Sequence, residues 1–306
     1  MTAYNKVALA GATGLMGTPI LEHLLQNNFD VTVLTREDSK ATFPDSVKVQ
    51  RVDYSSKESL VSALQGQDAV VSALTHLSIA TSEALLIDAA VEAGVKRFIP
   101  SEFASDATNP KAASFPLYTP KIASIKRLEA AAKTNPNFTY TSVITGPLLG
   151  WVVTQAFINP TDKTAKLYDG GDRVFSVVMR ATIGKAVAAV LSHPEDTKNR
   201  AVKVHDATST LRKLLAAVQK AVGEDGWTVS TPSVEEALAG AWAGVKAGRF
   251  DFPTIFGFIV AASQGEGYGG ELENVDNELL GISVKTDEEL QALVEKIVVG
   301  ADRTGW

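Results

Sequence analysis

The sequence of 306 residues contains no cysteine. That absence excludes disulfide frameworks, thiolate nucleophiles, and zinc or iron–sulfur centres held by thiolates, so any redox chemistry must come from a bound cofactor. Histidine is scarce as well. The four histidines lack metal-ligand spacing, and we expect no metal site among them: His23, His76, His193 and His205.

Neither a surplus of basic charge nor a long apolar run is present. The 29 Lys and Arg residues and 35 Asp and Glu residues leave a formal net charge of -6, and no basic stripe could neutralise successive phosphates. No run approaches the ~20 apolar residues of a membrane span. Met1–Lys6 leads into a strand-like run without a signal-peptide pattern. We therefore expect a cytoplasmic monomer or homodimer with no nucleic-acid or membrane partner.

Short runs rich in Val and Ile alternate with longer helical patterns over the first half of the chain. This alternation is typical of a parallel sheet covered by helices. The Ser55-x-x-Glu58 spacing also predicts a capping box at one of the helices. The predicted fold is α/β, a Rossmann-type doubly wound sheet. Its expected strands are Lys6–Ala10, Val31–Arg36, Val47–Asp53, Ala69–Leu74, Arg97–Ser101 and Tyr140–Thr145.

The regular alternation fades after Gly146-Pro147. Turn-rich sequence then mixes with helical patterns, which indicates a smaller α/β substrate domain. We predict a dinucleotide-binding domain over residues 1–150 and a substrate domain over residues 151–306. The run Val202–His205 reads as a further strand, so residues 200–207 are expected to return to the main sheet and interleave the two domains.

Three glycines follow the first predicted strand in the spacing Gly11-x-x-Gly14-x-x-Gly17, directly before a helical pattern. In this context the first glycine permits a tight turn, the second lets the backbone approach a pyrophosphate, and the third lets the helix pack on the strand. Backbone N–H groups would face the anion, with the Thr13 hydroxyl as a further donor. This glycine loop, Gly11–Gly17, predicts a dinucleotide site, although a glycine turn without a ligand would have the same spacing.

The end of the second predicted strand distinguishes two cofactors. NAD-binding folds usually place an acidic residue there to hold the ribose 2′-hydroxyl, whereas this strand ends in Arg36. A guanidinium can bind a 2′-phosphate through two charge-assisted hydrogen bonds. The sequence therefore favours NADPH, with Lys40 as a helper, while Glu37 and Asp38 keep NAD open. Asp53, at the end of the third strand, would contact adenine or simply lie in a solvated turn.

Several segments together resemble the NmrA-like, isoflavone-reductase-like group of atypical short-chain dehydrogenases. They are the glycine loop, Arg36, the run Arg97–Phe103 and Lys121 on the following helix. The resemblance implies an NADPH-dependent reductase acting on a small aromatic, phenylpropanoid-like molecule, with Lys121 as the catalytic group. Ala104 stands where plant members usually have glycine, and Thr145-Gly146-Pro147 replaces an Asn-containing segment, which points to a microbial branch and leaves the substrate open.

Lys121 is expected in the first turn of a helix that Thr119-Pro120 opens. Hydride delivery to a conjugated or benzylic carbon leaves negative charge on an attached oxygen, and an ammonium group can stabilise or protonate that oxygen. On local sequence alone, a solvated lysine at a helix start remains the alternative. Tyr118 does not supply the usual Tyr–Lys pair, because the spacing is one residue too short and proline interrupts it. We expect it to line the substrate pocket instead.

The remaining candidates follow the fourth, fifth and sixth strands, at the edge where ligands of open α/β sheets bind. We expect the cofactor to contact Leu15, Met16, Ala73, Leu74, Thr75, Ser101, Glu102, Phe103 and Pro147, with Glu102 ordering its loop rather than acting as a base. The expected substrate pocket is formed by His76, Tyr118, Trp151 and Phe157.

Two other functions stay open at this point. An NmrA-type redox-sensing regulator would bind NAD(P) without turnover and act through a protein partner. A sugar-nucleotide epimerase would need the Tyr–Lys pair that Tyr118 fails to provide. The presence of Lys121 favours the reductase over both.

Overall fold

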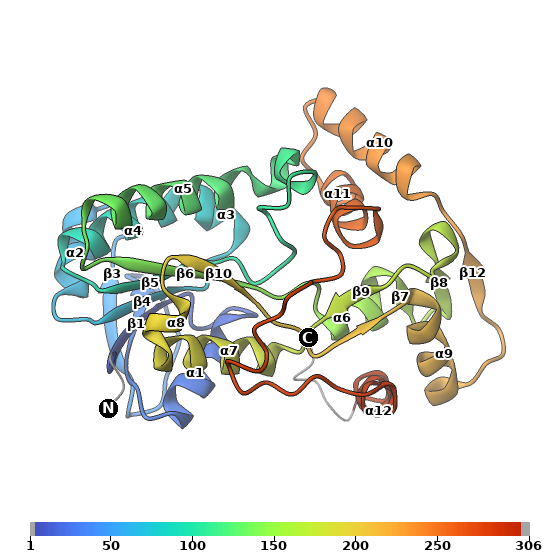
Figure 1. Ribbon diagram of the computed structural model, residues 1–306, viewed down its shortest axis with the longest axis horizontal. Helices are drawn as coiled ribbons and strands as arrows, with labels where there is room; N and C mark the ends of the chain where they lie inside the picture. The colour runs from blue at the N-terminus through green and yellow to red at the C-terminus, as the bar shows by residue number, and fades with distance from the viewer. Residues whose placement is uncertain (1–3, 301–306) are drawn as a thin grey trace.

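The computed structural model describes residues 4–300 of the chain. Its centre is a parallel sheet of seven strands in the order β10-β6-β5-β4-β1-β2-β3 (Figure 1). The prediction of a doubly wound α/β fold is confirmed, and the six predicted strands lie within two residues of their observed ends. The strands are β1 (Lys6–Ala10), β2 (Asp30–Arg36), β3 (Lys48–Val52), β4 (Ala69–Ser72), β5 (Arg97–Ile99), β6 (Thr139–Ile144) and β10 (Arg200–Lys203).

Helices cover both faces of this sheet because successive strand side chains point to opposite faces. Val7 and Leu9 of β1 pack in one apolar cluster with Ile20, while Ala8 and Ala10 pack in another with Leu60. On the first face lie α1 (Gly17–Gln26) and α7 (Arg180–Ser192); on the second lie α2 (Lys57–Leu64), α4 (Ala84–Glu92) and α5 (Thr119–Thr134) (Figure 1).

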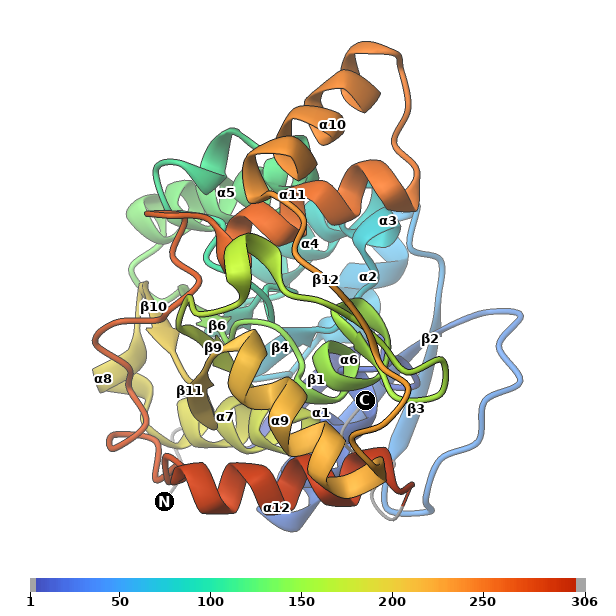
Figure 2. The ribbon, with the colours of Figure 1, turned by 90° about the vertical axis from the view of Figure 1, so that its right-hand side faces the viewer.

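The second half of the chain has its own core and two small sheets (Figure 2). One sheet pairs β9 (Phe175–Val177) with β11 (Ala207–Ser209), and the other contains β7 (Ile158–Asn159), β8 (Thr164–Lys166) and β12 (Thr228–Ser230). The helices here are α6 (Leu149–Trp151), α9 (Leu211–Val222), α10 (Val234–Lys246), α11 (Phe252–Gln264) and α12 (Asp287–Val298). A short helix, α8 (Pro194–Thr197), connects α7 to β10.

The two halves are interleaved in sequence. After β6 the chain builds β7, β8 and β9, and it then returns to the main sheet through α7 and β10, where Val202 lies opposite Val143. Helix α7 lies tightly on α1, because a Cβ at Gly184 would stand 2.2 Å from the main-chain oxygen of Pro19. The predicted return strand is therefore present as β10, which spans Arg200–Lys203 rather than Val202–His205.

The predicted capping box at Ser55 is wrong: α2 has a simple N-cap, one residue later. The cap of α2 is Ser56, which accepts the N–H of Ser59. Ser55 is engaged elsewhere, since its N–H and its hydroxyl both donate to Asp53 Oδ1. The local turn at Asp53 therefore takes the residue that the spacing had assigned to the helix cap.

Across residues 4–300 the structure holds no helix that is both long enough and apolar enough to span a bilayer.

Candidate functional site

The glycine loop lies at the carboxyl end of β1, beside β4. The chain passes from β1 to β2 on one side of the sheet and reaches β4 on the other, so the topology switches direction between β1 and β4. Ligands of open α/β sheets bind outside the strand ends at such a switch point. The fold thus places the loop where a cofactor site is expected.

Two glycines of the loop leave no room for a side chain. Gly11 has φ +81°, and a Cβ on it would stand 2.4 Å from the main-chain oxygen of Ala73. A Cβ on Gly17 would stand 2.0 Å from the main-chain oxygen of Gly11. Gly14 is less restricted, with 3.2 Å to the same oxygen, and its N–H closes the turn by donating to Gly11. The loop is therefore folded against the end of β4, which opens a space above it.

A cavity of about 350 Å³ occupies that space. The glycine loop contributes Gly11–Gly14, the end of β2 contributes Val33–Arg36, and the end of β4 contributes Ala73–Thr75. A neighbouring cavity of about 580 Å³ extends from Arg36 to Asp53 and the start of α4. Thr13 and Leu15 are exposed at the tip of the loop, and Met16 is half-buried. The elongated pair of cavities fits the phosphate and adenosine parts of a dinucleotide.

Arg36 lines both cavities and is exposed. The segment after it is held by Arg51 of β3, whose Nη1 donates to the main-chain oxygens of Glu37 at 2.7 Å and Ser39 at 2.9 Å. Lys40 is exposed and lines neither cavity. Asp53 lines the outer cavity, and hydrogen bonds from Ser55 keep the pKa of its carboxyl below the usual value.

Lys121 lies in the first turn of α5 and is buried, with 9% of its surface exposed. Its Nζ donates to the main-chain oxygen of Glu102, in the loop that follows β5. The alternative of a solvated lysine at a helix start is therefore wrong. We call the group Glu83, Ser101, Glu102, Lys121 and Ser124 the lysine corner.

The side chain of Glu102 is a buried acid with one unpaired oxygen. It is 5% exposed, and its Oε1 has no hydrogen-bond partner among the residues described. Burial raises the pKa of this carboxyl to about 7, against an opposing effect of the Lys121 charge and with smaller upward contributions from Glu83 and Asp106. The next residue, Phe103, has φ +24°, a strained backbone that frequently marks functional sites.

His76 and Tyr118, two residues expected in the substrate pocket, both have shifted pKa values. Burial, and then the positive charge of Lys121, lowers the pKa of His76, so the imidazole is neutral at neutral pH. Its ring stacks on Phe250, with centroids 6.3 Å apart. Tyr118 is 2% exposed, and burial raises its pKa to about 12. A phenol with so high a pKa is a weaker proton donor than an ordinary tyrosine.

Other predicted cofactor contacts lie around the same edge. Thr75 lines the inner cavity and its hydroxyl is 3.0 Å from the hydroxyl of Ser78. The Ser101 hydroxyl donates to the main-chain oxygen of Leu74 at 2.8 Å, which ties the ends of β4 and β5 together. Pro147 is half-buried and accepts the N–H of Val178.

The two aromatic residues expected in the substrate pocket lie in different surroundings. Phe157 is 2% exposed and packs edge-on against Tyr168, within the core of the second half. Trp151 is half-buried and stands edge-on to Phe256, with centroids 6.0 Å apart. Trp151 thus keeps surface that a ligand could contact, whereas Phe157 keeps almost none.

The structure adds residues that sequence reasoning missed. Glu83, Arg51 and Phe250 reach the site from segments without a motif, as the contacts of Arg51 and Phe250 already show. Arg180 at the start of α7 donates from Nε to the main-chain oxygen of Leu15 at 2.7 Å, so the second half of the chain also supports the glycine loop. No local sequence signal could have identified these residues, since each acts across a long separation in the chain.

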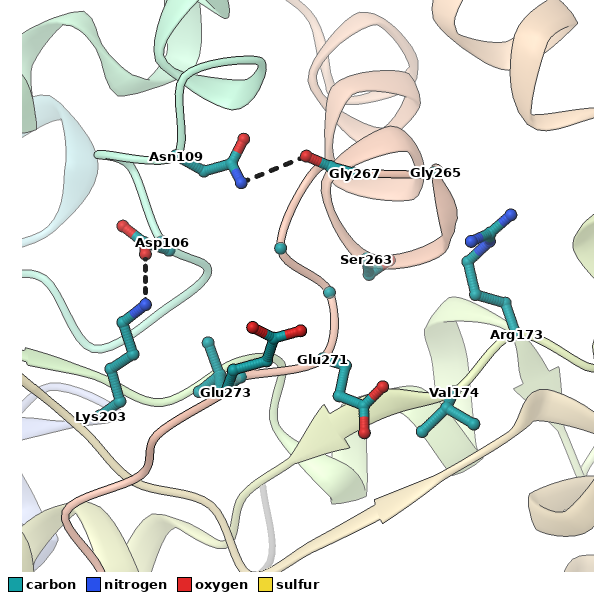
Figure 3. A pocket seen from close by; sticks show the side chains of 13 residues that line it. Asp106, Asn109, Arg173, Val174, Lys203, Ser263, Gly265, Gly267, Glu271 and Glu273 are labelled. Carbon is teal, nitrogen blue, oxygen red and sulfur yellow. Dashed lines mark hydrogen bonds and ion pairs between the residues drawn. The ribbon is translucent and has the colours of Figure 1, made fainter.

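A separate cavity of about 370 Å³ lies beyond the end of β10 (Figure 3). The Asp106–Lys203 ion pair, at 3.0 Å, forms one side, and Arg173 lies on the other. Its lining shares no residue with the two cavities beside the glycine loop. Within the described part of the chain no cluster of three or more His, Asp or Glu residues could hold a metal ion.

Comparison with known proteins finds similar sequences and a similar fold. The model of the NmrA-like family matches residues 3–238. The oxidoreductase aprR of Aspergillus flavus is 35% identical, over 95% of this chain and 99% of the relative. The oxidoreductase poxI of Penicillium oxalicum is 32% identical, over 94% of this chain and 93% of the relative. Among solved structures, the leucoanthocyanidin reductase–NADPH complex of Vitis vinifera has a TM-score of 0.76 at 18% identity, covering 95% of this chain and 99% of that one.

Proposed function

This chain belongs to the NmrA-like family, and from that premise we propose that it is an NADPH-dependent reductase of a small aromatic molecule, with Lys121 as proton donor or electrostatic stabiliser. The named relatives are oxidoreductases, which favours an enzyme over a regulator without turnover. The observation that carries the proposal is the burial of Lys121 against the main-chain oxygen of Glu102. The residue before Glu102, Ser101, is hydrogen-bonded to Leu74, which lines the cavity beside the glycine loop.

The glycine loop and Arg36 would hold NADPH. The loop has the close approach to β4 that a pyrophosphate cradle requires, and Arg36 lies exposed between the two cavities, where a 2′-phosphate could reach it. The presence of an arginine rather than a carboxylate at this strand end favours NADPH over NADH. When bound, NADPH supplies a hydride with its electron pair.

Lys121 would act on the oxygen of the substrate. Within residues 4–300 its one hydrogen-bond acceptor is the main-chain oxygen of Glu102, so two of its three N–H groups are available to a ligand. Its low exposure removes competing water, which strengthens its interaction with a developing negative charge. Neutral His76, beside it, could accept or donate a hydrogen bond without adding a second charge.

Aromatic side chains that keep exposed surface support an aromatic substrate. Phe250 is 46% exposed and stacks on His76, and Trp151 is half-buried against Phe256. Exposed ring surface favours a ligand that contains an aromatic ring. The relative from Vitis vinifera is named for leucoanthocyanidin, and we place a compound of this kind first among candidate substrates.

The test is NADPH oxidation by the purified chain with a panel of leucoanthocyanidins, isoflavones, lignans and quinones. We expect Lys121→Met to lower kcat at least ~100-fold, because the acid or cation of the reaction is lost. NADPH affinity, measured by fluorescence titration, should stay within about threefold of wild type, since a loss of less than 1 kcal/mol corresponds to that factor. Lys126→Met on the same helix is the matched control, because Lys126 is exposed.

Two results would contradict the proposal. Full turnover in Lys121→Met would remove Lys121 from the mechanism. Tight NADPH binding without turnover across the whole panel would favour the NmrA-type regulator, whose partner a stoichiometric pull-down would then have to identify.

A further inference from the structure

Glu83 is a buried carboxylate on the segment between β4 and α4. It is 1% exposed and ends the π-helical turn Ile79–Glu83, directly before α4. π-turns are rare and occur frequently at functional sites, because the extra residue redirects the side chains around it. A buried acid needs hydrogen-bond donors to offset its lost hydration, and the contacts of Glu83 show what it serves.

Both carboxylate oxygens of Glu83 are used. Oε1 accepts the N–H of Ser101 at 3.0 Å, and Oε2 accepts the hydroxyl of Ser124 at 2.6 Å. Both partners are donors, which is the arrangement that an ionised carboxylate prefers. Glu83 thus joins three elements at the carboxyl edge of the sheet, namely its own π-turn, the end of β5 and helix α5.

The two partners of Glu83 are next to the two partners of the Lys121 hydrogen bond. Ser124 lies three residues after Lys121 on α5, and residues at that spacing share a helix face. Ser101 directly precedes Glu102, whose main-chain oxygen accepts Lys121 Nζ. Glu83 therefore hydrogen-bonds both to helix α5, which carries Lys121, and to the loop after β5, which contains the acceptor of Lys121.

We propose that Glu83 is a positioning residue for Lys121, holding α5 and the Ser101–Glu102 backbone in the relative placement that aims the ammonium. The proposal rests on the function proposed above, because it is the role of Lys121 that gives the placement a purpose. Glu83 itself touches neither the cavity beside the glycine loop nor the outer one.

The first experiment needs no substrate. The full chain is treated with a limiting amount of acetic anhydride, and mass spectrometry compares acetylation of Lys121 with that of Lys126, which is exposed on the same helix. Glu83→Leu keeps the volume but leaves two donors without an acceptor, so we expect the Lys121/Lys126 ratio to rise about tenfold. Ser124→Ala, which removes one contact, should raise it about threefold.

The matched variants separate positioning from general destabilisation. Glu83→Gln can accept from Ser101 and donate to Ser124, so it should restore a ratio close to wild type. Glu92→Gln removes an exposed carboxylate of α4 that pairs with Lys57, and it should change nothing. A wild-type ratio in Glu83→Leu, or in Ser124→Ala if the leucine variant does not fold, overturns the proposal. General loosening would also raise the labelling of the half-buried Lys285 relative to Lys126, and that result overturns the proposal as well.

The second experiment uses turnover of the best substrate in the panel. Glu83→Leu should lower kcat about 30-fold at unchanged KM for NADPH, because a displacement of the acid by a fraction of an ångström affects the reacting step alone. In the Lys121→Met background the same substitution should cost nothing further. An equal loss in both backgrounds would mean that Glu83 does not act through Lys121. If no substrate is found, the labelling ratio still decides the role of Glu83, while the proposed function fails separately.

Discussion

The glycine loop and the lysine corner lie at the same edge of the sheet but are built in opposite ways. The loop depends on its backbone: it consists of seven consecutive residues, and the absence of a side chain at Gly11 permits close contact with Ala73. The corner is held together by side chains: Glu83 binds Ser101 and Ser124, and Lys121 binds the main-chain oxygen of Glu102, across three separate elements. We therefore expect the glycine loop to be disrupted by added side-chain volume, and the lysine corner by changes of charge and hydrogen bonding.

The largest effect is expected from Gly17→Ala. The new Cβ would stand 2.0 Å from a main-chain oxygen of the same loop, and backbone cannot give way as a flexible side chain would. We expect a loss of about 4 kcal/mol in the free energy of unfolding, at the upper end for single substitutions. Urea unfolding measures the stability, and fluorescence titration should show NADPH binding lost.

Gly240→Ala is the matched control for that substitution. Gly240 lies inside α10, and a Cβ there would meet nothing within 4 Å. Alanine should stabilise the helix by up to ~1 kcal/mol. Equal behaviour of the two variants would mean that helix propensity, and not the close approach at Gly17, governs the loop.

The second prediction concerns the pH dependence of stability at the lysine corner. Burial raises the pKa of the Glu102 carboxyl to about 7 in the folded chain, from 4.5 for a free glutamate. Between these values the folded state holds a proton that the unfolded state has released, so stability falls as pH rises. The loss from this group should approach about 3 kcal/mol at pH 8 and vanish below pH 4.5.

Glu102→Gln removes this titration while keeping the shape of the side chain. Urea unfolding from pH 4.5 to 8 should therefore show the variant gaining stability over wild type as pH rises. Parallel curves for the two proteins would mean that the carboxyl is ionised throughout, paired with Lys121. That result would mean that protonation of Glu102 does not distinguish the stability of the lysine corner from that of the glycine loop.

The same contrast explains how much could be predicted from the sequence. Strand positions and the glycine loop follow from local patterns, because apolar runs and glycine spacing are read within a few residues. Lys121 could be placed in a first helical turn, but its burial could not, since its partner Glu102 comes from the separate loop after β5. Phe157 was expected to face a ligand and lies in the core, as nothing in the sequence distinguishes the two environments.

The third and smallest effect is expected from Arg51→Ala. This variant tests whether the backbone conformation after β2 also contributes to cofactor binding. Arg51 holds the main-chain oxygens of Glu37 and Ser39 and so fixes the turn after Arg36. Losing two hydrogen bonds from an exposed guanidinium should weaken NADPH binding about fivefold and leave NADH binding unchanged, because only the 2′-phosphate depends on this turn. Fluorescence titration with both cofactors measures the ratio of the NADPH and NADH affinities.

Lys40→Ala is the control, since Lys40 lines neither cavity. Equal losses of NADPH affinity in the two variants would show that charge near the 2′-phosphate matters, and not the shape of the turn.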